Sequence, residues 1–118
     1  MDAQTTIADL KQKVKVFCEK RDWDQFHNPK ELAIGLSIEA SELLEHFLWL
    51  QKGEIDSKLA SKREAIEDEL ADILYFVLRI AQMNDIDLSE ALASKLQKND
   101  LKYPVEKSKG KHTKYTEL

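Results

Sequence analysis

Apolar residues recur every three or four positions along most of the chain, which is the spacing of one face of an α-helix. The stripes predict four helices, at about residues 6–20, 30–51, 57–83 and 88–102. No segment alternates with the period of a strand, and three glycines and two prolines are too few for the turns of an all-β protein. The pattern therefore predicts an all-α fold, and the short links favour an up-and-down four-helix bundle.

Pro104 stops the fourth predicted helix, and the sequence after it is polar and rich in lysine. We therefore expect one helical domain over residues 1–104 and a C-terminal tail over residues 105–118. Leu44 and Trp49 lie off the main apolar stripe of the second helix, so a lone bundle would leave them exposed. We therefore expect several subunits to associate.

The charge balance argues against two classes of partner. The 118 residues include 22 acidic and 18 basic side chains, a net charge of −4, whereas a nucleic-acid partner requires a basic face. The longest run without a charged residue, Leu32 to Ile38, is too short to cross a membrane. No signal peptide is visible, and Cys18 has no second cysteine with which to form a disulfide. We expect a cytoplasmic protein with neither a nucleic-acid nor a membrane partner.

Two acidic pairs interrupt the most apolar parts of the sequence. Glu39 and Glu42 lie within the second predicted helix, and Glu69 and Asp72 within the third. A spacing of three residues places both carboxylates of a pair on one helical face. If the two helices are antiparallel neighbours, the pairs face each other, and four buried carboxylates cannot all stay ionised without a cation. Ligands that are all oxygen favour Mg²⁺, Mn²⁺ or Ca²⁺.

A solvated acidic face is the alternative interpretation of these pairs. Six acidic pairs have this spacing, whereas chance placement of so many acids gives roughly four, so spacing alone is weak evidence. The position of Glu39 on the core stripe, between Leu36 and Leu43, favours a metal site. No glutamate is followed three residues later by a histidine, which excludes the ferritin-like di-iron pattern. A phosphate-binding glycine loop is also absent.

The order of these motifs resembles a known family. Glu-x-x-Glu, a spacer and Glu-x-x-Asp are the signature of the MazG-like superfamily of all-α nucleoside triphosphate pyrophosphohydrolases. Several further segments are similar to its dCTP pyrophosphatase branch. These segments are FCEKRDWDQFH at 17–27, SIEASEL at 37–43, FLW at 47–49, ELADILY at 69–75, the stretch 95–104, and KYTEL at 114–118.

The resemblance implies a role for each matching residue. The family's Mg²⁺ ligands correspond to Glu39, Glu42, Glu69 and Asp72. Trp23 matches an aromatic residue that packs on the nucleobase, and Trp49 matches a second aromatic of the pocket. Lys95 and Asn99 match positions that reach the phosphates and the sugar. Phe76 stands where some relatives carry a tyrosine, a change that touches recognition of the base or sugar.

Two further candidates lie beside these positions. Lys98 is one turn beyond Lys95 and could hold an outer phosphate, and His27 either contacts substrate or only helps Asn28 to begin the second helix. Trp49 could instead be a subunit contact. Glu39 or Glu42 is the candidate general base, because a carboxylate not fully used for coordination can take a proton from water.

The sequence thus predicts a Mg²⁺-dependent nucleotide pyrophosphohydrolase. Its substrate would be a deoxynucleoside triphosphate, with dCTP or a related nucleotide preferred, and its products the monophosphate and pyrophosphate. The resemblance also implies a dimer or a dimer of dimers, and a role in removing unwanted nucleotides from the pool. Two alternatives stay open: a superfamily member that acts on another nucleotide, such as dUTP or phosphoribosyl-ATP, and a non-catalytic helical scaffold.

Overall fold

The computed structural model describes residues 1–118 and contains six α-helices, two short 3-10 helices and no strands. The chain forms two compact units, Met1–Ile86 and Asp87–Leu118. The first unit holds α1 (Ile7–Glu19), α2 (Pro29–Glu45), η1 (Lys52–Glu54), α3 (Ile55–Ser61) and α4 (Arg63–Met83). The second unit holds α5 (Leu88–Lys102), α6 (Val105–Ser108) and η2 (Tyr115–Glu117). The all-α prediction is confirmed.

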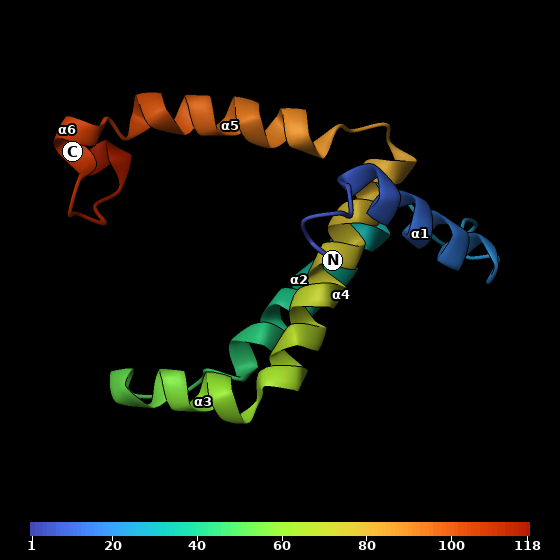
Figure 1. Ribbon diagram of the computed structural model, residues 1–118, viewed down its shortest axis with the longest axis horizontal. Coiled ribbons are helices and arrows are strands. Elements are labelled where there is room, and N and C mark those ends of the chain that lie inside the picture. The colour runs from blue at the N-terminus through green and yellow to red at the C-terminus, as the bar shows by residue number, and fades with distance from the viewer. The chain divides into compact units, whose positions relative to one another are not determined.

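The core of the first unit lies where α1 and α2 pack against α4. Helices α2 and α4 run side by side in opposite directions (Figure 1). The buried apolar residues are Cys18, Leu32, Ile66, Leu78 and Ala81. At Gly35 the two long helices approach closely, because a Cβ atom there would lie 2.5 Å from the ring of Phe76. None of the helices is both long and apolar enough to span a membrane.

Side-chain caps fix the starts of three helices, α1, α2 and α5. Thr6 and Asp9 form a capping box at α1, in which each side chain accepts the other's backbone N–H at 3.0 Å. The Asn28 side chain accepts the backbone N–H of Glu31 at 2.9 Å at the start of α2. Asp87 does the same for α5. These polar side chains satisfy backbone donors that have no partner within the helix.

Two predicted helix boundaries are wrong. The second helix was expected to reach residue 51, but α2 ends at Glu45, and the turn that follows places Trp49 in the left-handed region, with φ of 62°. The helix expected over residues 57–83 is broken at Lys62, with ψ of 25°, into α3 and α4. One non-helical residue leaves the apolar spacing almost unchanged, so the pattern could not show this break.

The C-terminal residues of the second unit also contain structure. Beyond Pro104 the chain forms α6 and later η2, and the ring of Tyr115 lies edge-on to that of Tyr103, with centroids 5.9 Å apart. The ammonium group of Lys102 lies 4.8 Å from the Tyr115 ring centre. These contacts attach the end of the chain to the last turn of α5.

Candidate functional site

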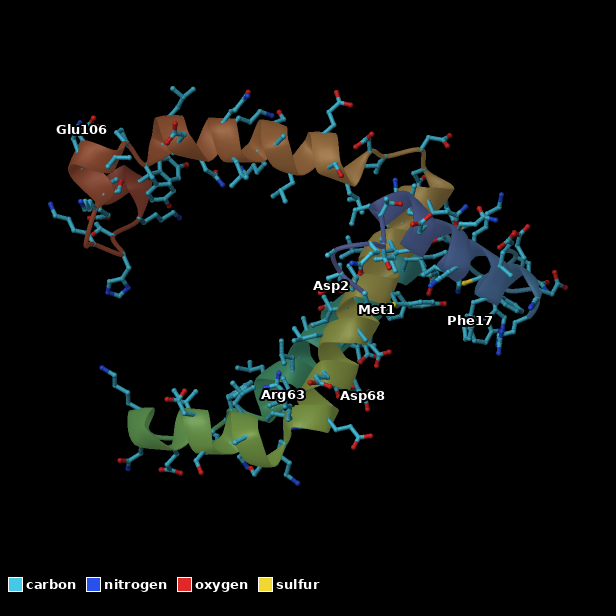
Figure 2. The ribbon with its side chains drawn as sticks, viewed as in Figure 1. Met1, Asp2, Phe17, Arg63, Asp68 and Glu106 are labelled. Carbon is cyan, nitrogen blue, oxygen red and sulfur yellow. The ribbon has the colours of Figure 1, made fainter.

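Three carboxylates from the two long helices of the first unit converge. Glu39 comes from α2, Glu69 and Asp72 come from α4, and one oxygen of each lies within 4.8 Å of the others. Figure 2 shows the side chains along α4 and labels Arg63, its first residue, and Asp68. Glu69 follows Asp68 in the sequence. The antiparallel packing brings the two pairs face to face because each pair lies on one face of its helix.

The cluster is electrostatically unbalanced without a counter-ion. The Oε2 atoms of Glu39 and Glu69 are buried and have no hydrogen-bond partner. Burial raises the pKa of Glu39 to about 7, reinforced by the neighbouring carboxyls of Glu42 and Glu69 and by the charges of Glu42 and Asp72. Glu42 therefore acts on the cluster through Glu39, although the three converging oxygens do not include its own. Together these oxygens form a donor set suited to a hard divalent cation.

His46 is a neighbour of the cluster to which the sequence pattern assigned no role. Its Nε2 atom lies 3.8 Å from Oε1 of Glu69, and both side chains are largely buried. The signal was present in the sequence, because His46 follows Glu39 by seven residues and Glu42 by four, and these spacings place all three on one face of a helix. The imidazole of His46 therefore faces Oε1 of Glu69, and the other carboxylate oxygen, Oε2, is the buried atom without a hydrogen-bond partner.

A second group of candidates lies in the loop between α1 and α2, residues 20–28, which we name the Trp23 loop. The Trp23 ring lies close to those of Phe17 and His27, with centroid distances of 5.8 Å and 6.1 Å, and its side chain remains 37% exposed. The guanidinium of Arg21 stacks 3.7 Å from the Phe17 ring centre. The same guanidinium lies 5.9 Å from the Trp23 ring centre. Trp23 is thus a supported aromatic surface that is partly exposed.

Arg79 ties the Trp23 loop to α4. Its Nε–H donates to Nδ1 of His27 at 2.9 Å, one Nη donates to Gln82 at 2.6 Å, and the other donates to Asp24. Burial lowers the pKa of His27, and the positive charge of Arg79 lowers it further, while Asp24 opposes the shift. The sequence pattern did not single out Arg79, because an arginine within an apolar run is usually read as a surface residue.

Phe76 lies on α4 between Asp72, a residue of the carboxylate cluster, and Arg79, which binds the Trp23 loop. Its half-buried ring packs over Gly35 and stands edge-on to Tyr75, with centroids 5.1 Å apart. The Tyr75 hydroxyl lies 3.1 Å from the Cys18 sulfur, and burial and this thiol raise the pKa of Tyr75. These contacts hold the aromatic side chains of α1 and α4 in fixed positions.

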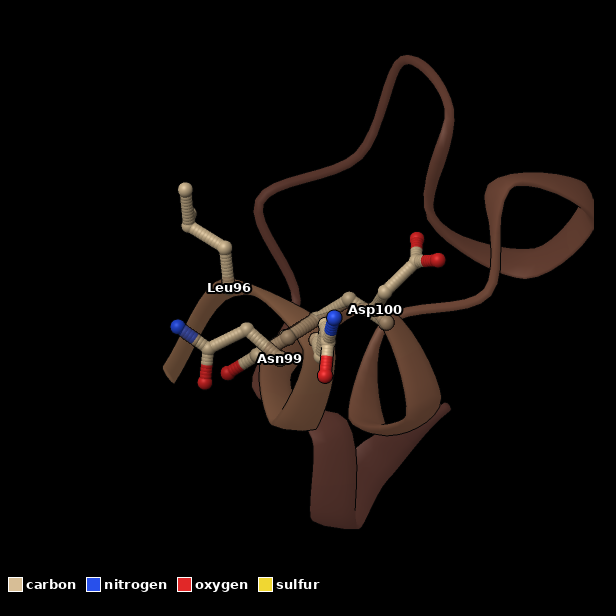
Figure 3. A pocket seen from close by; sticks show the side chains of 5 residues that line it. Leu96, Asn99 and Asp100 are labelled. Carbon is tan, nitrogen blue, oxygen red and sulfur yellow. The ribbon is translucent and has the colours of Figure 1, made fainter. Parts of the chain in front are cut away.

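Of the remaining candidates for substrate binding, three lie in the second unit and Trp49 lies in the first. Lys95 and Lys98 are exposed on α5 in the second unit. Asn99 belongs to an open hollow of about 520 Å³ on the same helix (Figure 3), lined by Leu96, Gln97, Asn99, Asp100 and Tyr103. Trp49, in the first unit, is 93% exposed and makes none of the aromatic contacts seen for Trp23.

Comparison with known proteins identifies the family. The MazG-like family matches residues 34–118, a range that includes both acidic pairs. This chain belongs to the MazG-like family. The MazG-like chain is 36% identical to dCTP pyrophosphatase 1 of Bos taurus over 118 residues, which cover 98% of this chain and 70% of that protein. It is also 36% identical to dCTP pyrophosphatase 1 of Homo sapiens over 117 residues, which cover 98% and 69%.

A solved structure supports the same assignment. The crystal structure of a pyrophosphatase from Archaeoglobus fulgidus matches this MazG-like protein with a TM-score of 0.80 and 35% sequence identity. The match covers 83% of this chain and 92% of that one. The family resemblance expected from the acidic motifs is therefore confirmed.

Proposed function

We propose that this MazG-like protein is a nucleotide pyrophosphohydrolase that converts deoxynucleoside triphosphates to the monophosphate and pyrophosphate, with dCTP or a related nucleotide preferred. The observation that carries the proposal is the convergence of Glu39, Glu69 and Asp72 with two buried oxygens left unpartnered. The dCTP pyrophosphatases among its relatives support the substrate class. The pyrophosphatase of similar structure supports the reaction class.

The residues present fit a Mg²⁺ site. The cluster offers only carboxylate oxygens, and its unpartnered buried oxygens require a positive charge. We assign Glu39, Glu42, Glu69 and Asp72 as the ligands. When bound, Mg²⁺ supplies charge neutralisation at the phosphates and lowers the pKa of an attacking water.

The protein's own side chains account for the rest of the reaction. A water oxygen forms a bond to one of the two phosphorus atoms that share the bridging oxygen of the α- and β-phosphates. The bond between that phosphorus and the bridging oxygen breaks, which separates the monophosphate from pyrophosphate. The proton of the water passes to Glu39 or Glu42, which act as the candidate general bases. The raised pKa of Glu39 supports its assignment as a proton acceptor.

Aromatic and basic side chains are assigned to substrate binding. In this proposal Trp23 packs on the nucleobase, Trp49 and Phe76 shape its pocket, and His27 donates a hydrogen bond to substrate. The assignment rests on the partial exposure of the Trp23 side chain and on the support that Phe17 and His27 give it. The phosphates and the sugar are assigned to polar residues of α5, namely Lys95, Lys98 and Asn99.

We further propose that the protein acts as a homodimer or homotetramer in nucleotide-pool house-cleaning in the cytoplasm. Association is supported by apolar side chains that the single chain leaves exposed, among them Leu44 at 59% and Trp49 at 93%. A reducing compartment is consistent with the free, buried Cys18.

The test is a panel of nucleotides. Purified protein with Mg²⁺ is given each common dNTP and NTP in turn, and the products are separated by ion-exchange chromatography. Monophosphate with pyrophosphate from a subset that includes dCTP supports the proposal. Diphosphate with phosphate would move the cleaved bond. No turnover of any nucleotide in the panel would favour a rarer substrate or a non-catalytic scaffold.

A further inference from the structure

Arg79 is the most deeply buried charged side chain of the first unit, with 1% of its surface exposed. It lies on α4, while two of its three hydrogen-bond partners, Asp24 and His27, lie in the Trp23 loop. A buried guanidinium is costly unless its donors are satisfied, and here each of its three nitrogens donates to an acceptor. The network therefore joins the loop to the helix that carries Glu69 and Asp72.

We propose that Arg79 is a positioning residue, which anchors the Trp23 loop against α4 and fixes His27 as the tautomer with its proton on Nε2. The inference rests on the proposed function, because it assigns a consequence to Trp23 as the nucleobase surface. Arg79 itself contacts no substrate in this account.

The tautomer follows from the direction of one hydrogen bond. An arginine side chain keeps its protons at any ordinary pH, so Arg79 Nε can only donate. His27 Nδ1 accepts that bond and so carries a lone pair, and the proton of the neutral ring sits on Nε2. His27 thereby presents an N–H donor to an acceptor of the substrate, such as a base carbonyl or a phosphate oxygen.

The helix sets the distance between the two halves of the site. Arg79 follows Asp72 by seven residues, which is two turns, so both project from nearly the same face of α4. The rise over seven residues is about 10 Å. An anchor at Arg79 therefore holds the Trp23 loop at a fixed place along the helix relative to the carboxylates.

The experiment compares Arg79→Met and Arg79→Lys with wild type, using the full chain and Mg²⁺. Arg63→Met is the matched control, because Arg63 lies on the same helix in an exposed pair with Glu67. The readouts are the ¹⁵N chemical shifts of the His27 ring, KM and kcat for dCTP, and the affinity for non-hydrolysable α,β-imido-dCTP. Circular dichroism verifies that each variant is folded.

We expect R79M to raise KM and the analogue Kd by about tenfold while kcat changes less than about threefold, because an anchor for binding is lost and the carboxylates are untouched. The ¹⁵N shifts should show a mixture of both His27 tautomers in R79M and the Nε2–H tautomer in wild type and R63M. R79K, which can satisfy fewer partners, should lie between R79M and wild type.

Asp24→Ala covers the case in which R79M does not fold, because Asp24 is the more exposed partner of the Arg79–Asp24 pair and its substitution leaves the Arg79 side chain in place. It should raise KM in the same direction by a smaller factor. Unchanged KM and an unchanged His27 tautomer in a folded R79 variant would overturn the inference.

Trp23→Ala separates the inference from the proposed function. If W23A raises KM and R79M does not, the proposed function stands and the role of Arg79 fails. If W23A leaves KM unchanged, the assignment of Trp23 fails, and the inference about Arg79 fails with it.

Discussion

Glu39 concentrates the chemistry of the site in one side chain. Its pKa is raised from 4.5 to about 7 because it is buried among other carboxyls. Between these pH values the folded protein binds more protons at this position than the unfolded chain does. The contribution of Glu39 to stability is therefore present below about pH 4.5 and is lost as the pH rises through about 7.

This sign gives a prediction for the metal-free protein. Glu39→Gln should unfold at a higher temperature than wild type at pH 8, and the difference should shrink at pH 5, because only wild type then holds the extra proton. Thermal unfolding in EDTA at both pH values measures it, with Glu45→Gln, an exposed acid on α2, as the control. A lower unfolding temperature for E39Q at pH 8 would contradict the account.

Added Mg²⁺ should reverse the order of the two unfolding temperatures, so that wild type unfolds at a higher temperature than E39Q. Wild type should gain stability when Mg²⁺ is added at pH 8, because a ligand that binds only the folded state stabilises it, and E39Q should gain little. Isothermal titration with Mg²⁺ should also show proton release near neutral pH, because Glu39 must be deprotonated to bind. Equal Mg²⁺ affinity in wild type and E39Q would exclude Glu39 as a ligand.

Gly35 tests the packing beneath the site. Gly35→Ala places a methyl group 2.5 Å from the Phe76 ring, and overpacking of this kind costs about 1–3 kcal/mol. The better helix propensity of alanine offsets about 1 kcal/mol of that cost. Chemical denaturation should therefore show a net loss of stability for G35A, whereas Gly53→Ala, at a position with open space, should show little change.

At the scale of single elements, the cap of α2 connects stability to the site. Asn28 begins the helix that carries Glu39 and immediately follows His27. Asn28→Ala should lower the free energy of unfolding by about 1 kcal/mol, because the Glu31 N–H loses its acceptor, and Asn28→Ser should restore most of it. Denaturant titrations of the two variants distinguish the cap from a general effect of substitution, which would lower both equally.

The helices themselves were largely predictable from the sequence. The apolar stripes gave the starts of α2 and α5 within a residue or two, and the structure shows Asn28 and Asp87 capping them. The break at Lys62 and the early end of α2 were not predictable, because a local change of backbone angle barely alters the spacing of side chains.

At the site, too, features set by local spacing were predictable from the sequence, and contacts between distant segments were not. Spacing and apolar surroundings predicted that the acidic pairs of two helices would face each other, and three of the four carboxylates do converge. Arg79 was missed because its importance comes from partners far along the chain, Asp24 and His27. The spacing of His46 from Glu39 and Glu42 placed it on their face of the helix, but its contact with the distant Glu69 was not visible. A single sequence does not show such pairings.

At the scale of the whole molecule, the exposed apolar side chains point to association. Leu44→Asp should shift sedimentation velocity toward a smaller species, because burying a leucine at an interface contributes about 1.5–3 kcal/mol and a charge there opposes assembly. Gln12→Asp, at an exposed position on α1, is the control because it makes the same change of charge. A wild-type protein that sediments as a monomer at all concentrations would contradict the proposed oligomer.

The most direct test follows the phosphorus atoms. Hydrolysis of dCTP with Mg²⁺ is monitored by ³¹P NMR for wild type and for Asp72→Asn. We predict dCMP and pyrophosphate from wild type, and a rate at least about 100-fold lower for D72N, the upper end of the cost of losing even an outer-shell partner of a metal. Release of dCDP and phosphate, or undiminished turnover by D72N, would contradict the claim that these carboxylates support cleavage of the α–β phosphate bridge.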